Sequence, residues 1–265
     1  YSFVKNLNFL QINSFIGIYS FNMILITIFS TPAILYLNRN KNNLFGICLI
    51  IIASFCIYIY GALNIKNFNN KEPQDLSVNL KVLSTNIPIE RFYSNFDDEE
   101  ILIELINLSN PNPNENTIFV WPEGAIPNIN LRSLKEEYRF LFEKSFSDNH
   151  FIILGINDDK TIHEKFKYYN SLAIVNNRTD VLYKYYKNKL VPFGEFLPLE
   201  KILLKLGLKS LTNNYQSYSA SSERKVFNFA NYNKIKILPL ICYEIIYSGK
   251  LSEEYNYNII INISE

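Results

Sequence analysis

Two long apolar stretches stand at the beginning of the chain. No charged residue occurs between Lys5 and Arg39, and residues 15–37 within that interval are mostly Ile, Leu and Phe. A second uncharged stretch has its apolar body at residues 44–63. Each is long enough for the ~20 residues that a membrane-spanning helix needs, and neither shows the polar face of a helix in a soluble protein. We therefore expect a membrane region over residues 1–66 with two transmembrane helices.

Basic residues lie both between the two stretches and at their outer ends. Arg39 and Lys41 occupy the connection, whereas Lys5 and Lys66 lie at the opposite ends. Counting positive charges therefore does not fix the orientation of the helices in a membrane. A signal peptide is disfavoured, because two apolar stretches occur in tandem and no small-residue cleavage site stands out.

After a polar linker at residues 67–76 the pattern becomes one of short apolar runs and helical periodicity. Strands are predicted at residues 78–83, 117–121, 151–154, 171–175, 181–186 and 258–264, and in the apolar run that begins at Lys234. Helices are predicted after the capping residues Asp97 and Asp98 and over residues 131–142. This alternation predicts an α/β catalytic domain over residues 77–265, with helices packed on a sheet.

The composition excludes several classes of function. The 26 basic and 25 acidic residues give no electrostatic footprint for nucleic acid. The two histidines lack metal-ligand spacing, and no cofactor is indicated. The three cysteines do not form a disulfide framework. Because Cys48 and Cys56 lie in the second apolar stretch, Cys242 is the only thiol beyond the membrane region.

Three candidate residues follow predicted strands. Glu123 comes just after one strand, Lys187 ends a second, and Cys242 stands at the end of a third. Taken singly, they could be a solvated loop carboxylate, a surface lysine and a small core residue. At one sheet edge, however, they form a complete set for acyl transfer through a thioester. A thiol needs a base to ionise it, and an ammonium can stabilise a tetrahedral oxyanion.

The residues around these three positions carry a resemblance to a known family. The motifs are Trp121-Pro122-Glu123, Lys187 followed by Leu190-Val191-Pro192-Phe193-Gly194-Glu195, and Ile241-Cys242-Tyr243-Glu244. They resemble the apolipoprotein N-acyltransferase family of the nitrilase (carbon–nitrogen hydrolase) superfamily, over nearly the whole chain. The resemblance implies a nitrilase-like α-β-β-α sandwich preceded by transmembrane helices.

The resemblance also implies roles for individual residues. Glu123 is expected to act as the base, Lys187 to stabilise the intermediate, and Cys242 to attack as the nucleophile. Supporting roles in the active site are expected for Glu195, Glu244, Trp121 and Tyr243.

The reaction implied by the resemblance moves an acyl chain from a phospholipid onto the cysteine. The chain then passes to the N-terminal amine of a diacylglyceryl-cysteine on an apolipoprotein. The expected partners are the phospholipid donor, the apolipoprotein acceptor and the lipid bilayer, without nucleic acid. The expected location is the bacterial inner membrane, as a multi-pass protein with its catalytic domain on the periplasmic side. Tethering by two spans would bring such a domain to membrane substrates at high effective concentration.

Two further expectations concern the end of the domain and its loops. Residues 203–224 are expected to form an active-site loop, with leucines between lysines in its first part and Ser, Asn and Tyr in its second; a surface helix followed by a loop is the alternative. The sandwich is expected to be incomplete at its C-terminus, as in a fragment. Two other functions stay open: a nitrilase-superfamily amidase that acts on a soluble substrate, and a non-catalytic membrane fragment that retains the motifs.

Overall fold

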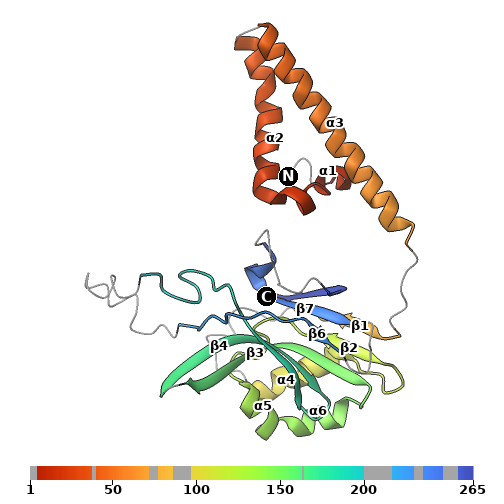
Figure 1. The fold of residues 1–265 in the computed structure, drawn as a ribbon. Helices are drawn as coiled ribbons and strands as arrows, with labels where there is room; N and C mark the ends of the chain where they lie inside the picture. The colour runs from red at the N-terminus through yellow and green to blue at the C-terminus, as the bar shows by residue number, and fades with distance from the viewer. Residues whose placement is uncertain are drawn as a thin grey trace. The chain divides into compact units, whose positions relative to one another are not determined.

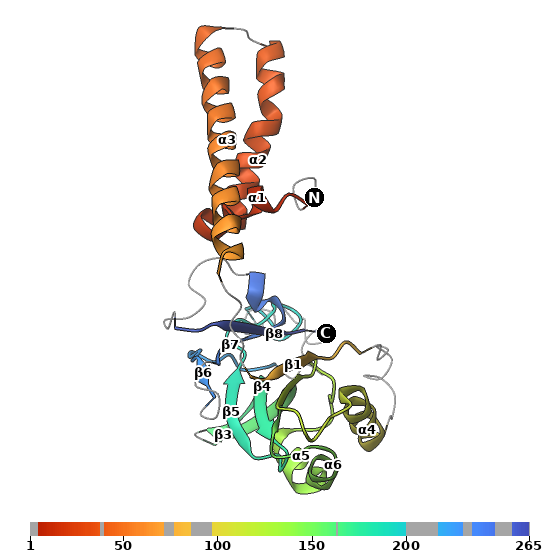
Figure 2. The same ribbon diagram turned by 90° about the vertical axis from the view of Figure 1, so that its right-hand side faces the viewer.

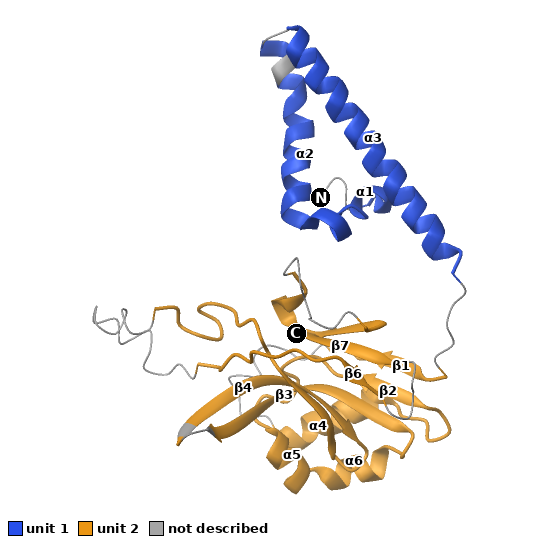
Figure 3. Ribbon diagram, in the orientation of Figure 1, with its two compact units in different colours: residues 1–74 blue, residues 75–265 orange. Residues whose placement is uncertain are grey.

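The computed structural model describes residues 5–37, 40–71, 77–85, 97–162, 164–199, 217–229, 235–246 and 256–264. The chain divides into two compact units, Tyr1–Gln74 and Asp75–Glu265, which are coloured separately in Figure 3.

The first unit consists of three helices, α1 (Leu7–Leu10), α2 (Asn13–Leu37) and α3 (Lys41–Asn69). The two apolar stretches of the sequence lie within α2 and α3. By length and composition, residues 13–33 of α2 and the whole of α3 could cross a membrane. α2 is not one straight helix, because Gly17 has φ 75° and ψ 164° and interrupts it with a kink. α1 packs closely on α3, since a Cβ at Gly61 would lie only 1.8 Å from the carbonyl oxygen of Asn8.

The second unit is built on a five-stranded sheet in the order β1-β2-β3-β4-β5. Its strands are β1 (Asn79–Val82), β2 (Thr117–Val120), β3 (His150–Ile162), β4 (Lys165–Asn176) and β5 (Val181–Tyr186). β1, β2 and β3 run parallel, whereas β3, β4 and β5 are antiparallel neighbours. β3 and β4 are much longer than predicted, because their pairing continues past the apolar core into a polar and aromatic hairpin.

Three helices cover one face of this sheet, as Figures 1 and 2 show: α4 (Asp98–Ser109), α5 (Leu131–Glu137) and α6 (Arg139–Ser145). The predicted cap of α4 is confirmed, since the side chain of Asp97 accepts a hydrogen bond from the N–H of Glu99. The single helix expected over residues 131–142 is instead two short helices. Tyr138 separates them, with φ −111° and ψ 3°. Buried apolar side chains of the helices and of this sheet face form one core.

A second sheet lies against the other face and has the order β6-β7-β8. Its strands are β6 (Phe227–Asn228), β7 (Lys236–Ile241) and β8 (Ile259–Ile263), and β7 and β8 are parallel. A second apolar core fills the space between the two sheets. The domain is therefore α/β, as predicted, and its described part shows helices, sheet and sheet in successive layers (Figure 1).

Candidate active site

The three residues predicted from strand ends line one cavity of about 510 Å³. Glu123 follows β2, Lys187 follows β5 in the same sheet, and Cys242 follows β7 in the other sheet. The cavity thus lies where the ends of strands from both sheets meet, which is where open α/β sheets usually bind ligands.

Two glycines allow the position of Glu123: one in the turn that follows β2, and one on the neighbouring strand β3. Gly124, directly after it, has φ 64°, a conformation that glycine adopts readily. On the neighbouring strand β3, a Cβ at Gly155 would lie 2.7 Å from the Cα of Glu123 and 3.1 Å from the carbonyl oxygen of Pro122. Glycine at position 155 therefore allows the Glu123 backbone to approach the sheet closely.

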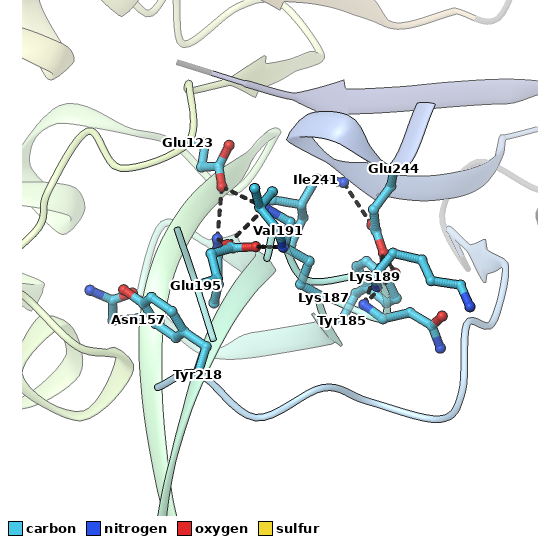
Figure 4. Close-up of polar contacts among 12 residues, drawn as sticks. Glu123, Asn157, Tyr185, Lys187, Lys189, Val191, Glu195, Tyr218, Ile241 and Glu244 are labelled. Atoms are coloured by element: carbon cyan, nitrogen blue, oxygen red, sulfur yellow. Dashed lines mark hydrogen bonds and ion pairs between the residues drawn. The ribbon is translucent and has the colours of Figure 1, made fainter. Parts of the chain in front are cut away.

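Lys187 is a buried cation held between two carboxylates. Its side chain is 1% exposed, and its Nζ lies 2.8 Å from Glu195 Oε1 and 3.4 Å from Glu123 Oε1 (Figure 4). Burial disfavours the ammonium, but the two carboxylates outweigh it and raise the pKa of Lys187 above its ordinary value. Lys187 therefore carries a fixed positive charge beside the thiol at neutral pH.

Cys242 has a strained backbone. It begins the short 3-10 helix η3 (Cys242–Ile246) with φ 55°, a left-handed conformation that is uncommon outside glycine. Its thiol shares the cavity with the carboxylate of Glu123. Burial, followed by the charge of Glu123, raises the pKa of Cys242 despite the opposing effect of Lys187. The sulfur is therefore a thiol at rest and needs proton removal before it can attack.

Asn170 on β4 is part of the site and was not predicted. Its side-chain amide donates hydrogen bonds to Glu123 Oε1 at 2.7 Å and to Glu195 Oε1 at 2.8 Å. It thus holds the two carboxylates side by side around Lys187. Glu195 is fixed from its other oxygen as well, since Oε2 accepts a hydrogen bond of 2.8 Å from the N–H of Val191.

Glu244 lies behind the cavity and connects its two sides. Its carboxylate accepts hydrogen bonds from the N–H groups of Ile241 at 2.9 Å, Asn188 at 2.9 Å and Lys189 at 3.0 Å. Ile241 directly precedes the nucleophile, whereas Asn188 and Lys189 directly follow Lys187. One carboxylate therefore fixes the turn after β7 and the turn after β5, which belong to different sheets (Figure 4).

The charge of Glu244 is paired in the interior. Arg224 Nη2 lies 2.7 Å from Glu244 Oε1, and the two side chains are 9% and 0% exposed. The hydroxyl of Tyr185 also donates to both carboxylate oxygens, at 2.8 Å and 2.9 Å. Burial and the charge of Glu244 raise the pKa of Tyr185, so its hydroxyl stays protonated and can donate. Neither Arg224 nor Tyr185 was predicted as a site residue.

The two aromatic residues implied by the resemblance lie away from the cavity. The side chain of Trp121 is buried in the core beneath the helices, where its indole N–H donates to Ser109 Oγ at 2.9 Å. Tyr243 is 55% exposed and is not among the described residues that line the cavity. Active-site support from these two side chains therefore stays a prediction.

The loop expected at residues 203–224 lies only partly within the described residues. Residues 203–216 lie outside the described residues, whereas residues 217–224 are described. Tyr218 in the second part lines the catalytic cavity. Among the described residues, no three His, Cys, Asp or Glu side chains are grouped as a metal site requires.

Comparison with known proteins identifies relatives but no family model that matches. The chain is 27% identical over 257 residues to apolipoprotein N-acyltransferase of Rhizobium rhizogenes, covering 94% of the chain and 47% of that protein. It is 31% identical over 281 residues to apolipoprotein N-acyltransferase of Rickettsia typhi, covering 100% of the chain and 51% of that protein. The chain therefore spans about half the length of the curated relatives it matches.

Similarity to solved structures is weaker. A nitrilase-superfamily amidase of Nesterenkonia AN1 matches with a TM-score of 0.44 and 10% identity over 72% of the chain and 66% of the amidase. A glutamine-dependent NAD+ synthetase of Acinetobacter baumannii matches with a TM-score of 0.41 and 16% identity over 63% of the chain and 29% of the synthetase. The relationship of the chain to known proteins therefore rests on the sequence comparison. The chain is a relative of the apolipoprotein N-acyltransferases over nearly its whole length.

Proposed function

We propose that this chain acts in lipoprotein maturation, by transferring an acyl chain from a phospholipid to the N-terminal amine of an apolipoprotein. The observation that carries this proposal is the convergence of Glu123, Lys187 and Cys242 on one cavity. The sequence relatives named apolipoprotein N-acyltransferase support the choice of reaction.

In the first half-reaction the thiol of Cys242 gives its proton to Glu123, which lines the same cavity. The sulfur attacks the ester carbonyl of the phospholipid and forms a C–S bond. The resulting oxyanion is stabilised by the ammonium of Lys187, a contribution worth about 2.7–4 kcal/mol for one well-placed donor. The ester C–O bond then breaks, the lysophospholipid oxygen takes the proton from Glu123, and a thioester remains on Cys242.

In the second half-reaction the amine of the diacylglyceryl-cysteine attacks the thioester carbonyl. A C–N bond forms, Glu123 accepts a proton from the amine, and Lys187 again faces the oxyanion. The C–S bond breaks, and the proton returns from Glu123 to the sulfur of Cys242. The cycle therefore needs no group beyond the two substrates and these three side chains.

The proposed location is the bacterial inner membrane, with several membrane passes and the second unit on the periplasmic side. The apolar helices α2 and α3 support a membrane location by their length and composition. Tethering to the bilayer would hold the catalytic unit near both lipid substrates.

The proposal can be tested with membranes that contain the chain and a phospholipid with a labelled acyl chain. After denaturation we expect label on the protein that hydroxylamine releases and that Cys242→Ala prevents. Such label would establish Cys242 as the acylated nucleophile. If label is absent here and also absent from a longer relative treated in parallel, the phospholipid donor is wrong, and an amidase acting on a soluble substrate becomes the better hypothesis. Label on the relative alone would instead favour a non-catalytic chain.

A further inference from the structure

A second, smaller cavity adjoins the catalytic cavity, and we call it the side pocket. Its volume is about 220 Å³, and it is lined by Pro127, Asn128, Ile129, Asn130, Asn157, Tyr168 and Tyr218. Pro127, Asn157 and Tyr218 line the catalytic cavity as well. Independent ligand sites usually measure roughly 300–1,000 Å³. The shared wall and small size therefore indicate an extension of the catalytic cavity.

Hydrogen bonds fix the wall between the two cavities. The hydroxyl of Tyr218 donates to Asn157 Oδ1 at 3.1 Å, and Asn157 Nδ2 donates to the carbonyl oxygen of Pro127 at 3.1 Å. The backbone N–H of Tyr218 donates to the carbonyl oxygen of Glu195 at 2.8 Å. Figure 4 shows Tyr218 and Asn157 side by side next to Glu195. The wall is thus hydrogen-bonded to Glu195, which itself contacts Lys187.

The side pocket differs from the catalytic cavity in charge. Its lining side chains are amides, phenols and apolar groups, whereas Glu123, Lys187 and Glu195 line the catalytic cavity. An anionic lipid headgroup would find no cation among the described lining residues, and burying an unpaired charge is costly. Asn130 and Asn157 are already bonded at both ends of their amides within the protein. Asn128, whose Nδ2 donates to Asp98 at 3.0 Å, also carries an acceptor oxygen, and Tyr168 carries a hydroxyl, which together suit a neutral ligand with donors and acceptors. A peptide backbone has this chemistry.

We propose that the side pocket binds the peptide backbone of the lipoprotein acceptor, directly after the residue whose amine is acylated. This assignment rests on the proposed function. The amine has to reach the thioester on Cys242, and the polypeptide attached to it has to leave through a neighbouring opening. The side pocket provides a polar, uncharged path on the far side of the wall formed by Tyr218 and Asn157. The phospholipid donor does not use this path, so the pocket serves only the second half-reaction.

The test separates the two half-reactions. The protein is first loaded with a labelled acyl chain from phospholipid, and the label on Cys242 is measured. Transfer is then followed to two acceptors, diacylglyceryl-cysteine amide and the same compound extended by a short uncharged peptide. The main variant is Asn128→Ala combined with Tyr168→Phe, because these residues line the side pocket and not the catalytic cavity. Asn128→Trp, which narrows the pocket at an exposed position, is the second variant.

We expect the unmodified protein to transfer label faster to the extended acceptor than to the short one. Both variants should lose this preference, with the extended acceptor slowed about tenfold, the effect of one lost hydrogen bond at the strong end of the usual range. Loading of Cys242 and transfer to the short acceptor should be unchanged. Tyr183→Phe is the control, because it removes a tyrosine hydroxyl that bonds to Lys225 elsewhere on the sheet.

Two results would overturn the assignment. Equal rates for the two acceptors in the unmodified protein would show that the pocket does not bind the peptide. Variants that slow both acceptors equally would show that these residues only support the structure. If Cys242 is never loaded, the proposed function itself fails, and the assignment falls with it.

Discussion

Arg224 and Glu244 form a buried ion pair, with Arg224 Nη2 2.7 Å from Glu244 Oε1, behind the catalytic cavity. The same carboxylate accepts the backbone N–H groups on either side of the site, at Ile241 and at Asn188. The Glu244 carboxylate therefore fixes the position of Cys242 relative to Lys187, and Arg224 neutralises this buried carboxylate. Arg224 is in this sense a positioning residue.

Replacing Arg224 tests this dependence. Arg224→Met leaves a buried carboxylate without its cation, which typically costs about 3–5 kcal/mol. We expect a large fall in the urea midpoint of the full chain in detergent. Fluorescence can report it, because Trp121 is the single tryptophan of the chain and is fully buried.

The neighbouring Lys225 provides a matched control for Arg224. Its ion pair with Glu223 is exposed, with 67% and 68% of the two side chains accessible. Lys225→Met should therefore leave the midpoint nearly unchanged, since exposed pairs contribute little. Equal effects of the two substitutions would contradict the structural role given to Arg224.

Lys187→Met should remove the cation that faces the oxyanion. We expect the rate of acyl loading onto Cys242 to fall by about 10²–10³, the usual effect of losing one such donor. The measurement is label bound to the protein at early times. Lys189→Met is the control, because the Lys189 side chain is exposed and its backbone N–H, which donates to Glu244, is kept. A loss of less than tenfold would argue against Lys187 as the stabilising group.

The ionisation of Cys242 predicts a pH dependence. Because burial and Glu123 raise its pKa, alkylation of Cys242 by iodoacetamide should reach half its maximal rate at a pH above the ordinary value for a thiol. Glu123→Gln removes the neighbouring negative charge, so the midpoint should move to lower pH. The measurement uses a chain in which Cys48 and Cys56 are replaced by Ser, so that only Cys242 reacts. A midpoint that rises in Glu123→Gln would show that the carboxylate does not face the sulfur.

Gly155→Ala should displace Glu123, the proposed base, while leaving its carboxylate unchanged. The added methyl group would lie 2.7 Å from the Cα of Glu123, so the turn that carries this carboxylate has to move. A shift of 1 Å in a catalytic group can cost about 10²-fold in rate, and we expect a loss of that order in acyl loading. Gly46→Ala is the control, because a Cβ there meets nothing within 4 Å. Full activity of Gly155→Ala would show that the close approach is not required.

The sequence was sufficient to bring Glu123, Lys187 and Cys242 to one place, because each follows an apolar run. Strand ends are local features, and the ends of β2 and β5 lie in the same sheet. The cap of α4 at Asp97 was predictable for the same reason, since capping depends on nearby residues. The expectation of a single sheet edge was wrong for Cys242, because β7 belongs to the second sheet, and the packing of the two sheets brings its end to the cavity.

Asn170 and Arg224 could not be predicted in this way. Asn170 reaches Glu123 only because β3 and β4 pair in a register that places it opposite Asn157. That register is set by long-range packing. Arg224 is the last residue of the active-site loop expected at residues 203–224, but no periodicity there indicates which way a side chain points. The break at Tyr138 was missed because apolar positions on both short helices face the same core and so mimic one continuous helix.

The burial of Lys187 between two carboxylates has a consequence for the lifetime of the proposed thioester. A thioester is an acylating agent, and the side-chain amine of Lys187 lines the same cavity as Cys242. A neutral lysine in this position would capture the acyl chain as an amide and end turnover after one cycle. Because Glu123 and Glu195 favour the ammonium form, Lys187 has no lone pair with which to attack. The two carboxylates thus prevent acylation of Lys187, and the acyl chain stays on Cys242 until the amine of the acceptor attacks it.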